Sequence, residues 1–93
     1  MEGEVEPLEL LCPITGAMFR DPVIAADERT YERAAILEHI ARRRRYFRWP
    51  TSPYHGGPLE HTAVMTNWAV RAAVDRWLEE NPLRTPEGWL GCK

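Results

Sequence analysis

The cysteine content limits how this chain can be held together, because it supplies neither a zinc site nor a disulfide framework. Cys12 and Cys92 are the two cysteines of the 93-residue sequence, and neither belongs to a Cys-x-x-Cys pair. Structural zinc sites usually draw their ligands from closely spaced cysteine and histidine pairs. His55 and His61 are six positions apart and have no cysteine pair nearby. We therefore expect no metal site. A Cys12–Cys92 bridge stays open, although two free thiols are favoured in a reducing compartment.

The length and composition are those of one small globular domain. A chain of this size buries roughly 60–65% of its unfolded surface. Hydrophobic residues make up 44% of the sequence and charged residues 28%, which excludes a disordered tail. No apolar run approaches the roughly 18 residues that cross a bilayer. The first six residues are acidic, unlike a secretory signal. We expect a cytoplasmic or nuclear protein that makes no membrane contact.

The first half of the chain predicts a β-hairpin followed by a helix. The β-prone run Pro22–Ala26 leads into a turn at Asp27–Arg29, and the residues after the turn can pair back. Thr30 is the expected N-cap of a helix from about Tyr31 to Arg43, with Glu32 in its first turn.

The second half predicts a long loop, a short strand and a second helix. The loop covers Tyr46–Gly57, and Leu59 together with Ala63-Val64-Met65 is expected to add a short strand. Asn67 caps a helix that runs from Trp68 to about Glu80. Four apolar residues follow helical spacing on its core-facing side: Val70, Val74, Trp77 and Leu78. Trp77 and Val74 are expected to pack in the core. We find no internal repeat.

The sequence contains no conventional active site. Cys12 is a poor candidate nucleophile, because the apolar Leu10-Leu11 before it and Pro13 after it are typical of a buried, unreactive thiol. Gly56-Gly57 alone does not make a phosphate-binding loop. We therefore expect no covalent intermediate and no cofactor.

Several short blocks carry a family signature through their order and spacing. They are Cys12-Pro13-Ile14-Thr15-Gly16, Phe19–Ile24, Asp27, Thr30–Arg33, Ser52-Pro53 with Leu59 six residues on, and Thr66-Asn67 before a helix that ends Arg76-Trp77-Leu78. In this order the blocks resemble the U-box family of ubiquitin ligases. The resemblance covers about residues 8–81. Because some members of that family pair through the second helix, it leaves a homodimer face at Trp77 and Val74 as the alternative to core packing.

The resemblance implies an α+β, RING-like fold in which polar side chains replace zinc. It has a short hairpin with a third strand, a central helix, a C-terminal helix and two bracing loops. Residues 1–7 would be a flexible acidic lead-in, residues 8–81 the domain and residues 82–93 a C-terminal tail. Five polar residues are the candidate braces: Asp27, Thr30, Glu32, Ser52 and Asn67.

The function that the resemblance implies is that of a ubiquitin ligase module. Such a module docks a ubiquitin-conjugating enzyme that carries thioester-linked ubiquitin, and promotes transfer to a lysine of a protein substrate by positioning alone, with no catalytic side chain. The matching docking positions are Ile14, His39 and Pro53. Read without the family, Ile14 could pack in the core, His39 could be a solvated helix residue and Pro53 a turn residue.

Two positions depart from the family pattern. Glu28 stands where members often have a glycine after the hairpin aspartate, so we expect the turn to differ locally. Gly56, with His55 beside it, stands where active members often carry a basic or amide residue that bridges ubiquitin and the conjugating enzyme. Loss of that bridge would weaken activation, so the alternative function is a non-catalytic interaction scaffold.

The charge pattern adds two further expectations. Arg42–Arg48 contains five arginines together with two aromatic residues, and Trp49 follows. Such a cluster can form a nucleic-acid patch, but a solvated cationic face is the simpler interpretation, so no nucleic acid is expected. Lys93 is the one lysine; this predicts little self-modification, or reflects a general preference for arginine.

Overall fold

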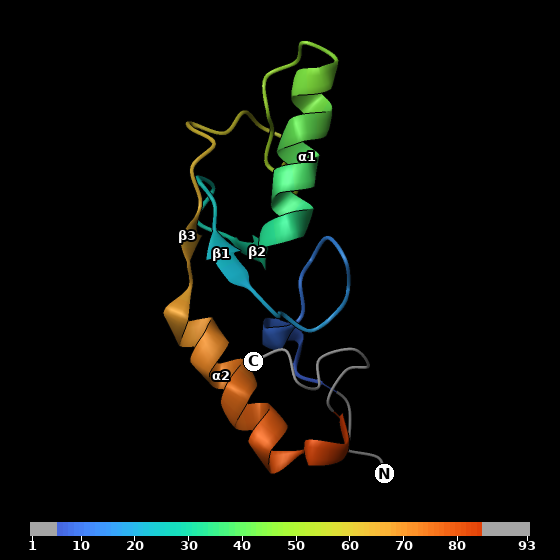
Figure 1. The fold of residues 1–93 in the computed structure, drawn as a ribbon. Coiled ribbons are helices and arrows are strands. Elements are labelled where there is room, and N and C mark those ends of the chain that lie inside the picture. Colours follow the sequence, from blue (N-terminus) through green and yellow to red (C-terminus); the bar gives the residue numbers. More distant parts are fainter. Residues whose placement is uncertain (1–5, 85–93) are drawn as a thin grey trace.

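A computed structural model describes residues 6–84 and shows a small α+β domain in which a sheet lies between two helices (Figure 1). The elements are η1 (Leu8–Leu10), β1 (Pro22–Ile24), β2 (Thr30–Glu32), α1 (Arg33–Arg45), β3 (Met65–Thr66), α2 (Trp68–Glu80) and η2 (Pro82–Arg84). The predicted fold class is confirmed. Neither α1 nor α2 is long and apolar enough to cross a membrane.

The three strands form an antiparallel sheet in the order β2-β1-β3. Val23 pairs with Tyr31 in the hairpin, and Ile24 pairs with Met65 across the other edge of β1. Val23 and Tyr31 are fully buried and lie at the centre of the core. The predicted hairpin and third strand are therefore present, and the third strand is one residue further along than its predicted end.

The predicted start of the first helix is wrong. Residues 30–32 form β2, and α1 begins at Arg33. Residues 30–32 form a strand and not a helical turn because they pair with β1. In addition, the Glu32 carboxylate accepts from the N–H groups of Arg20 (2.8 Å) and Asp21 (3.0 Å). Thr30 caps no helix: its Oγ1 accepts from Asn67 Nδ2 at 2.8 Å.

The second helix forms as predicted. It covers Trp68–Glu80, and Asn67 Oδ1 accepts from the Val70 N–H at 3.1 Å. Of the predicted stripe, Val74 and Leu78 are buried, and Val70 and Trp77 pack partly buried against the core. The stripe therefore attaches α2 to the rest of the domain, and the homodimer interpretation of Trp77 stays a prediction.

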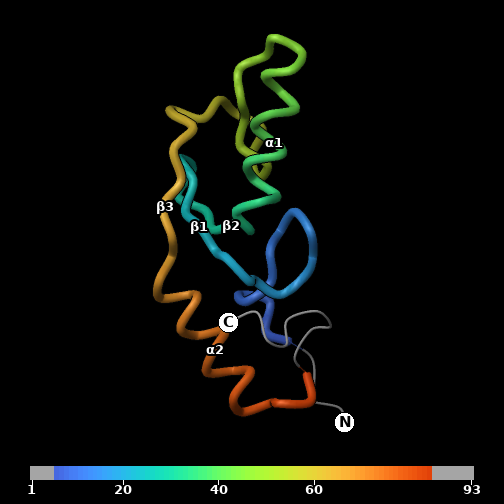
Figure 2. The backbone as a smooth tube through the Cα atoms, in the orientation of Figure 1, coloured from blue at the N-terminus to red at the C-terminus, as the bar shows by residue number. Residues whose placement is uncertain are grey.

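The structure contains a short repeat that the sequence did not indicate. We name residues 10–19 loop 1 and residues 50–59 loop 2; both lie beside α1 (Figure 2). Cys12 N–H donates to Ala17 O at 2.8 Å in loop 1, and Ser52 N–H donates to Gly57 O at 2.7 Å in loop 2. The bridges Leu11–Met18 and Thr51–Pro58 close the two loops in the same way. Loop 2 thus repeats the backbone of loop 1 at an offset of forty positions.

Each loop has a glycine at the same place, where the backbone takes a conformation that other residues rarely adopt. Gly16 has φ 74° and Gly56 has φ 79°, in the left-handed region that glycine enters at little cost. Each glycine N–H also donates to the carbonyl oxygen of the residue four positions earlier, at 2.7 Å in loop 1 and 2.9 Å in loop 2. Gly56 therefore has a structural reason to be glycine, independent of any role in activation.

Several of the residues singled out in the sequence are not among residues 6–84. Cys92 and Lys93 lie outside the described residues, as do most of the predicted lead-in and tail. The disulfide and self-modification expectations therefore stay predictions. Within the described part of the tail, Arg84 Nη2 lies 3.8 Å from Glu6 Oε2, so the two ends of the described chain approach each other.

Candidate functional site

Loop 2 is held by a buried hydroxyl. Ser52 Oγ donates to Asp27 Oδ2 at 2.6 Å and accepts from the N–H groups of Tyr54 (3.0 Å) and His55 (3.2 Å). Asp27 also accepts from the Tyr31 hydroxyl at 2.5 Å. The hairpin turn and loop 2, which are 25 positions apart, are therefore joined by hydrogen bonds that converge on one carboxylate.

This network sets the protonation states of two of its members. Burial raises the pKa of Asp27, but hydrogen bonds from Ser52, Tyr31 and the Arg29 N–H outweigh it, so the pKa lies below its ordinary value of 3.8. Burial, together with the hydrogen bond to Asp27, raises the pKa of Tyr31 above its ordinary value. Asp27 is thus a carboxylate and Tyr31 a neutral donor at neutral pH.

Loop 1 is held by a sulfur atom at the equivalent position. Cys12 Sγ accepts from the N–H groups of Ile14 (3.4 Å) and Glu32 (3.2 Å), and its side chain is buried. Cys12 is buried, as predicted from the sequence, but its two hydrogen bonds were not predicted. The signal that could have found them is the match between Cys12-Pro13 and Ser52-Pro53.

Two further contacts tie the sheet to the helices. Asn67 links β2 to the start of α2 through its bonds to Thr30 and Val70. Arg33, which sequence reasoning did not select, donates from Nε to Asp21 Oδ2 at 2.8 Å and from Nη2 to Thr66 Oγ1 at 2.9 Å. Each of the five candidate braces therefore makes at least one side-chain hydrogen bond between segments far apart in the sequence.

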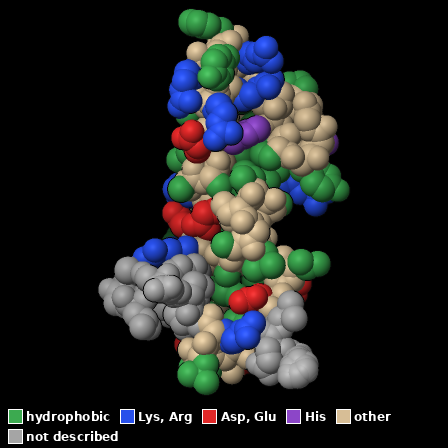
Figure 3. Space-filling model, turned by 90° about the vertical axis from the view of Figure 1, so that its right-hand side faces the viewer, with side chains coloured by type: hydrophobic (Ala, Val, Ile, Leu, Met, Phe, Trp, Pro, Cys, Tyr) green, Lys and Arg blue, Asp and Glu red, His purple; other side chains and the backbone are tan. Residues whose placement is uncertain are grey.

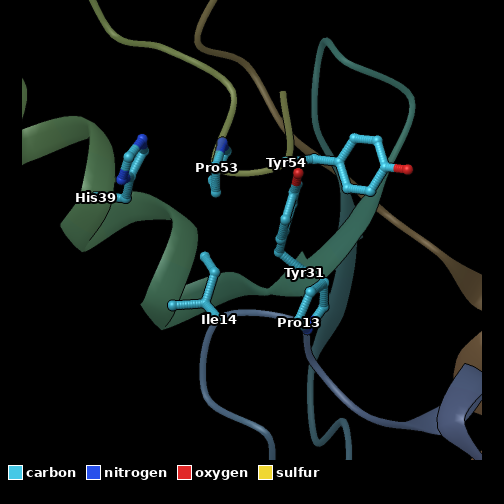
Figure 4. A pocket seen from close by; sticks show the side chains of 6 residues that line it. All are labelled: Pro13, Ile14, Tyr31, His39, Pro53 and Tyr54. Atoms are coloured by element: carbon cyan, nitrogen blue, oxygen red, sulfur yellow. The ribbon is translucent and has the colours of Figure 1, made fainter. Parts of the chain in front are cut away.

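The two loops and α1 enclose a shallow groove of about 470 Å³ (Figure 4). It is lined by Pro13, Ile14, Tyr31, His39, Pro53 and Tyr54. All three predicted docking residues, one from each of three segments, thus lie around one hollow. Pro13, Tyr31 and Tyr54 are lining residues that the sequence analysis did not select.

The exposure of the docking residues bears on the alternatives left open above. Ile14 is 40% exposed, so it is not part of the core. His39 is half-buried and donates from Nε2 to Thr51 O at 2.7 Å, so its ring is fixed against the start of loop 2. Pro53 is half-buried. The groove therefore has an apolar rim and a fixed imidazole, and its shape depends on the bracing of both loops.

The residues at the two departures from the family pattern lie outside the groove lining. Glu28 adopts the left-handed backbone, with φ 65°, a conformation that favours glycine, and the expected local difference of the turn stays a prediction. His55 and Gly56 are exposed at the tip of loop 2, where His55 Nδ1 accepts from the Gly57 N–H at 3.0 Å. The Arg29 guanidinium lies 3.6 Å from the centre of the Tyr54 ring and covers the adjoining side of the loop.

Within residues 6–84, no three histidine, cysteine, aspartate or glutamate side chains are grouped as metal ligands. In the groove, the Tyr31 hydroxyl donates to Asp27 and His39 Nε2 donates to the backbone carbonyl of Thr51.

Comparison with known proteins gives consistent matches. A sequence model of the U-box domain matches residues 7–83. The chain is similar to the WD repeat, SAM and U-box domain-containing protein 1 of Danio rerio, with 44% identity over 71 residues, 76% of this chain and 14% of that protein. The protein of the same name from Gallus gallus is 41% identical over 73 residues, 78% of this chain and 14% of that protein. U-box domain-containing protein 1 of Medicago truncatula is 37% identical over 81 residues, 87% of this chain and 11% of that protein.

The chain spans 14% or less of the length of these three relatives. The family match nevertheless extends over both loops, the sheet and both α-helices. The chain therefore belongs to the U-box family, whose members are generally ubiquitin ligase modules.

Proposed function

We propose that this domain is a ubiquitin ligase module whose groove docks a ubiquitin-conjugating enzyme that carries thioester-linked ubiquitin. The observation that carries the proposal is the groove itself, in which Ile14, His39 and Pro53 come together from loop 1, α1 and loop 2. A protein substrate would supply the lysine that accepts ubiquitin.

The chemistry of the groove suits a small, exchanging interface. An exposed isoleucine beside a proline offers a small apolar area to a partner. The hydrogen-bonded loops present this area without having to be ordered on binding, which reduces the entropy cost of association.

Transfer would be promoted by positioning. Two of the titratable residues that line the groove, Tyr31 and His39, are engaged in hydrogen bonds within the domain. The domain would instead restrict the thioester to geometries open to attack by the lysine, and such restriction alone can supply a large rate effect.

A discharge assay tests the proposal. The domain is mixed with a conjugating enzyme loaded with ubiquitin, and loss of the thioester to free lysine is followed with time. Ile14→Ala should reduce the acceleration by at least about tenfold, as expected for the loss of a central apolar contact. Leu37→Ala is the matched control, because Leu37 is 44% exposed on α1 but does not line the groove. Equal effects of the two substitutions would refute groove docking.

Gly56 favours a second candidate, a non-catalytic scaffold that docks the conjugating enzyme without activating it. Space around the Gly56 Cα is open, so a longer side chain would meet no neighbour, although φ 79° strains any residue other than glycine. Under the scaffold function, the wild type should bind without accelerating discharge, and Gly56→Arg should restore acceleration. Gly56→Ala has the same backbone strain without the charge and should restore nothing.

A further inference from the structure

The C-terminal end of α1 carries a dense positive charge. We name Arg42–Arg48 the arginine tip; it contains five arginines. Figure 3 shows basic side chains gathered at the end of the molecule where α1 ends, beside a histidine. Two aromatic residues of the tip are also at the surface, with Tyr46 66% and Phe47 98% exposed. Neither the groove nor the core accounts for this combination.

A hollow of about 460 Å³ lies within the arginine tip. It is lined by Arg42, Arg43, Tyr46 and Arg48. The two other arginines turn elsewhere: Arg44 Nη2 donates to Thr62 Oγ1 at 3.1 Å, and Arg45 Nη2 lies 4.0 Å from Glu38 Oε2. The tip is therefore not a uniform cationic face, since three arginines border one hollow and two do not.

The backbone after α1 produces this convergence. The Arg48 N–H donates to Arg43 O at 3.0 Å, and the Phe47 N–H donates to Arg44 O at 2.9 Å, which are the two bonds of a Schellman motif. The chain thus folds back and places Arg48 beside Arg43. Phe47 has φ 60°, where a bulky residue is an outlier and glycine is usual. Strain of this kind is concentrated at functional sites.

The guanidinium groups around the hollow have N–H donors that are not used in hydrogen bonds to other described residues. Arg43 Nε donates to Trp49 O at 3.3 Å, and its terminal nitrogens make no hydrogen bond to another described residue. Arg42 approaches Glu38 only at 3.7 Å on an exposed surface, which makes a weak pair. Arg48 has no side-chain partner within residues 6–84. The hollow therefore suits an anion that has several acceptor oxygens.

We propose that this hollow binds the phosphate of a phosphorylated side chain in a protein segment. A phosphate monoester carries a charge of about −1.5 to −2 and three strong acceptor oxygens. Arginine forks bind phosphate through paired hydrogen bonds, and clusters of arginine recognise phosphorylated motifs in this way. The exposed Tyr46 ring at the edge of the hollow can pack against a residue next to the phosphorylated one.

A single-stranded nucleic acid is the competing ligand, because arginines with exposed aromatic rings also bind such strands. It fits the geometry less well. A nucleic acid presents a row of singly charged phosphates and needs a basic groove along which the strand runs, whereas here the arginines surround one hollow. The chain as a whole has a net charge of −2, which disfavours an extended polyanion.

The hollow lies on the same face of α1 as the groove. His39 lines the groove, and Arg42, Arg43 and Tyr46 follow it at i+3, i+4 and i+7. A segment held in the hollow would lie about 5–10 Å along the helix from His39. If the proposed function holds, that segment belongs to a substrate recruited beside the docked conjugating enzyme. Phosphate binding itself does not depend on the proposed function.

Fluorescence anisotropy with the full chain tests the inference. The probes are a labelled peptide with a central phosphoserine between apolar and acidic residues, the same peptide with serine, and a labelled oligouridylate of similar length. The serine peptide should bind at least about tenfold more weakly than the phosphopeptide, and Arg42→Ala and Arg48→Ala should each weaken phosphopeptide binding by a similar factor. Arg45→Ala is the matched control, because it removes the same charge from the same helix end without touching the hollow, and should change binding less than about threefold.

Three results would overturn the inference: equal loss in Arg45→Ala and Arg48→Ala, equal binding of the serine and phosphoserine peptides, or tighter binding of oligouridylate than of phosphopeptide. The three substituted residues, Arg42, Arg45 and Arg48, are exposed. Each variant is compared with the wild type in urea unfolding to confirm that it is folded. Ile14→Ala should leave phosphopeptide binding unchanged while reducing discharge. The failure of either proposal can thus be told from the failure of the other.

Discussion

Replacing Ser52 with alanine removes a buried hydroxyl, 2% exposed, that bonds to three partners. Its hydrogen bond to the Asp27 carboxylate is charge-assisted and contributes about 1.5–3 kcal/mol. The N–H groups of Tyr54 and His55 belong to exposed residues, where water can replace the lost acceptor, so together they add about 1 kcal/mol or less. We expect the free energy of unfolding to fall by about 1.5–4 kcal/mol, a large part of the stability of a small domain.

Urea unfolding measures this loss, followed by tryptophan fluorescence and by circular dichroism. Trp49 reports on loop 2, because its Nε1 donates to Leu59 O at 2.7 Å. Ser52→Cys is the matched control, since it places in loop 2 the side chain that loop 1 has at the equivalent position. Cys12 Sγ accepts from two backbone N–H groups there, so the thiol at position 52 should keep weak acceptor bonds and lose the strong bond to Asp27. Its loss of stability should lie between those of wild type and alanine.

If Ser52→Ala unfolds at the same urea midpoint as the wild type, and its free energy of unfolding has the same dependence on urea concentration, loop 2 does not depend on this hydroxyl. The bracing explanation would then fail for loop 2. A double-mutant cycle with Asp27→Asn isolates the shared interaction, because losses that simply add would mean that the hydroxyl and the carboxylate do not stabilise each other.

Three further predictions concern the hairpin turn and its network. Glu28→Gly should raise the free energy of unfolding by about 0.5–1 kcal/mol in urea, because relief of the left-handed strain exceeds the added entropy of the unfolded chain, whereas Glu28→Ala should change little. The folded-state pKa of Asp27 lies below 3.8, so the contribution of its carboxylate to the free energy of unfolding is complete above that pH and is lost as the pH falls further. In Asp27→Asn, the free energy of unfolding should therefore fall less steeply than in the wild type as the solution is made more acidic. The pKa of Tyr31 is raised above 10.0, so the contribution of its neutral hydroxyl to the free energy of unfolding is complete below pH 10 and declines as the pH rises beyond it. If Tyr31→Phe loses as much stability above pH 10 as the wild type does, the loss does not come from Tyr31.

The parts of the fold that local signals determine could be predicted from the sequence. Asn67 before α2 and Asn81-Pro82 after it define the bounds of the helix, and both signals act within one helical turn. The start of α1 was missed because Thr30 and Glu32 have local signals for a helix but pair with β1 instead. A pairing partner distant in sequence decides the conformation of such a segment, and periodicity does not reveal it.

The candidate site was predictable in part, and only through the family. Ile14, His39 and Pro53 were selected by resemblance, and the structure brings all three to one groove. The repeat of loop 1 in loop 2 was missed because the two eight-residue stretches that start at Leu11 and Thr51 share only a proline and a glycine. The shared element is a hydrogen-bond pattern in which sulfur in one loop does what oxygen does in the other, and sequence identity does not report that equivalence.

The repeat also explains why the groove lies between the loops. Pro13 and Ile14 in loop 1 are equivalent to Pro53 and Tyr54 in loop 2, and all four line the groove. In each loop the brace accepts from the N–H two residues later, so Cys12 fixes the backbone of Ile14 and Ser52 fixes that of Tyr54. Each brace therefore holds the residue that presents its side chain to the groove. Ser52→Ala should accordingly shift the amide resonance of Tyr54 and leave that of Ile14 in place; if both move together, the groove behaves as one unit and the two loops are not braced independently.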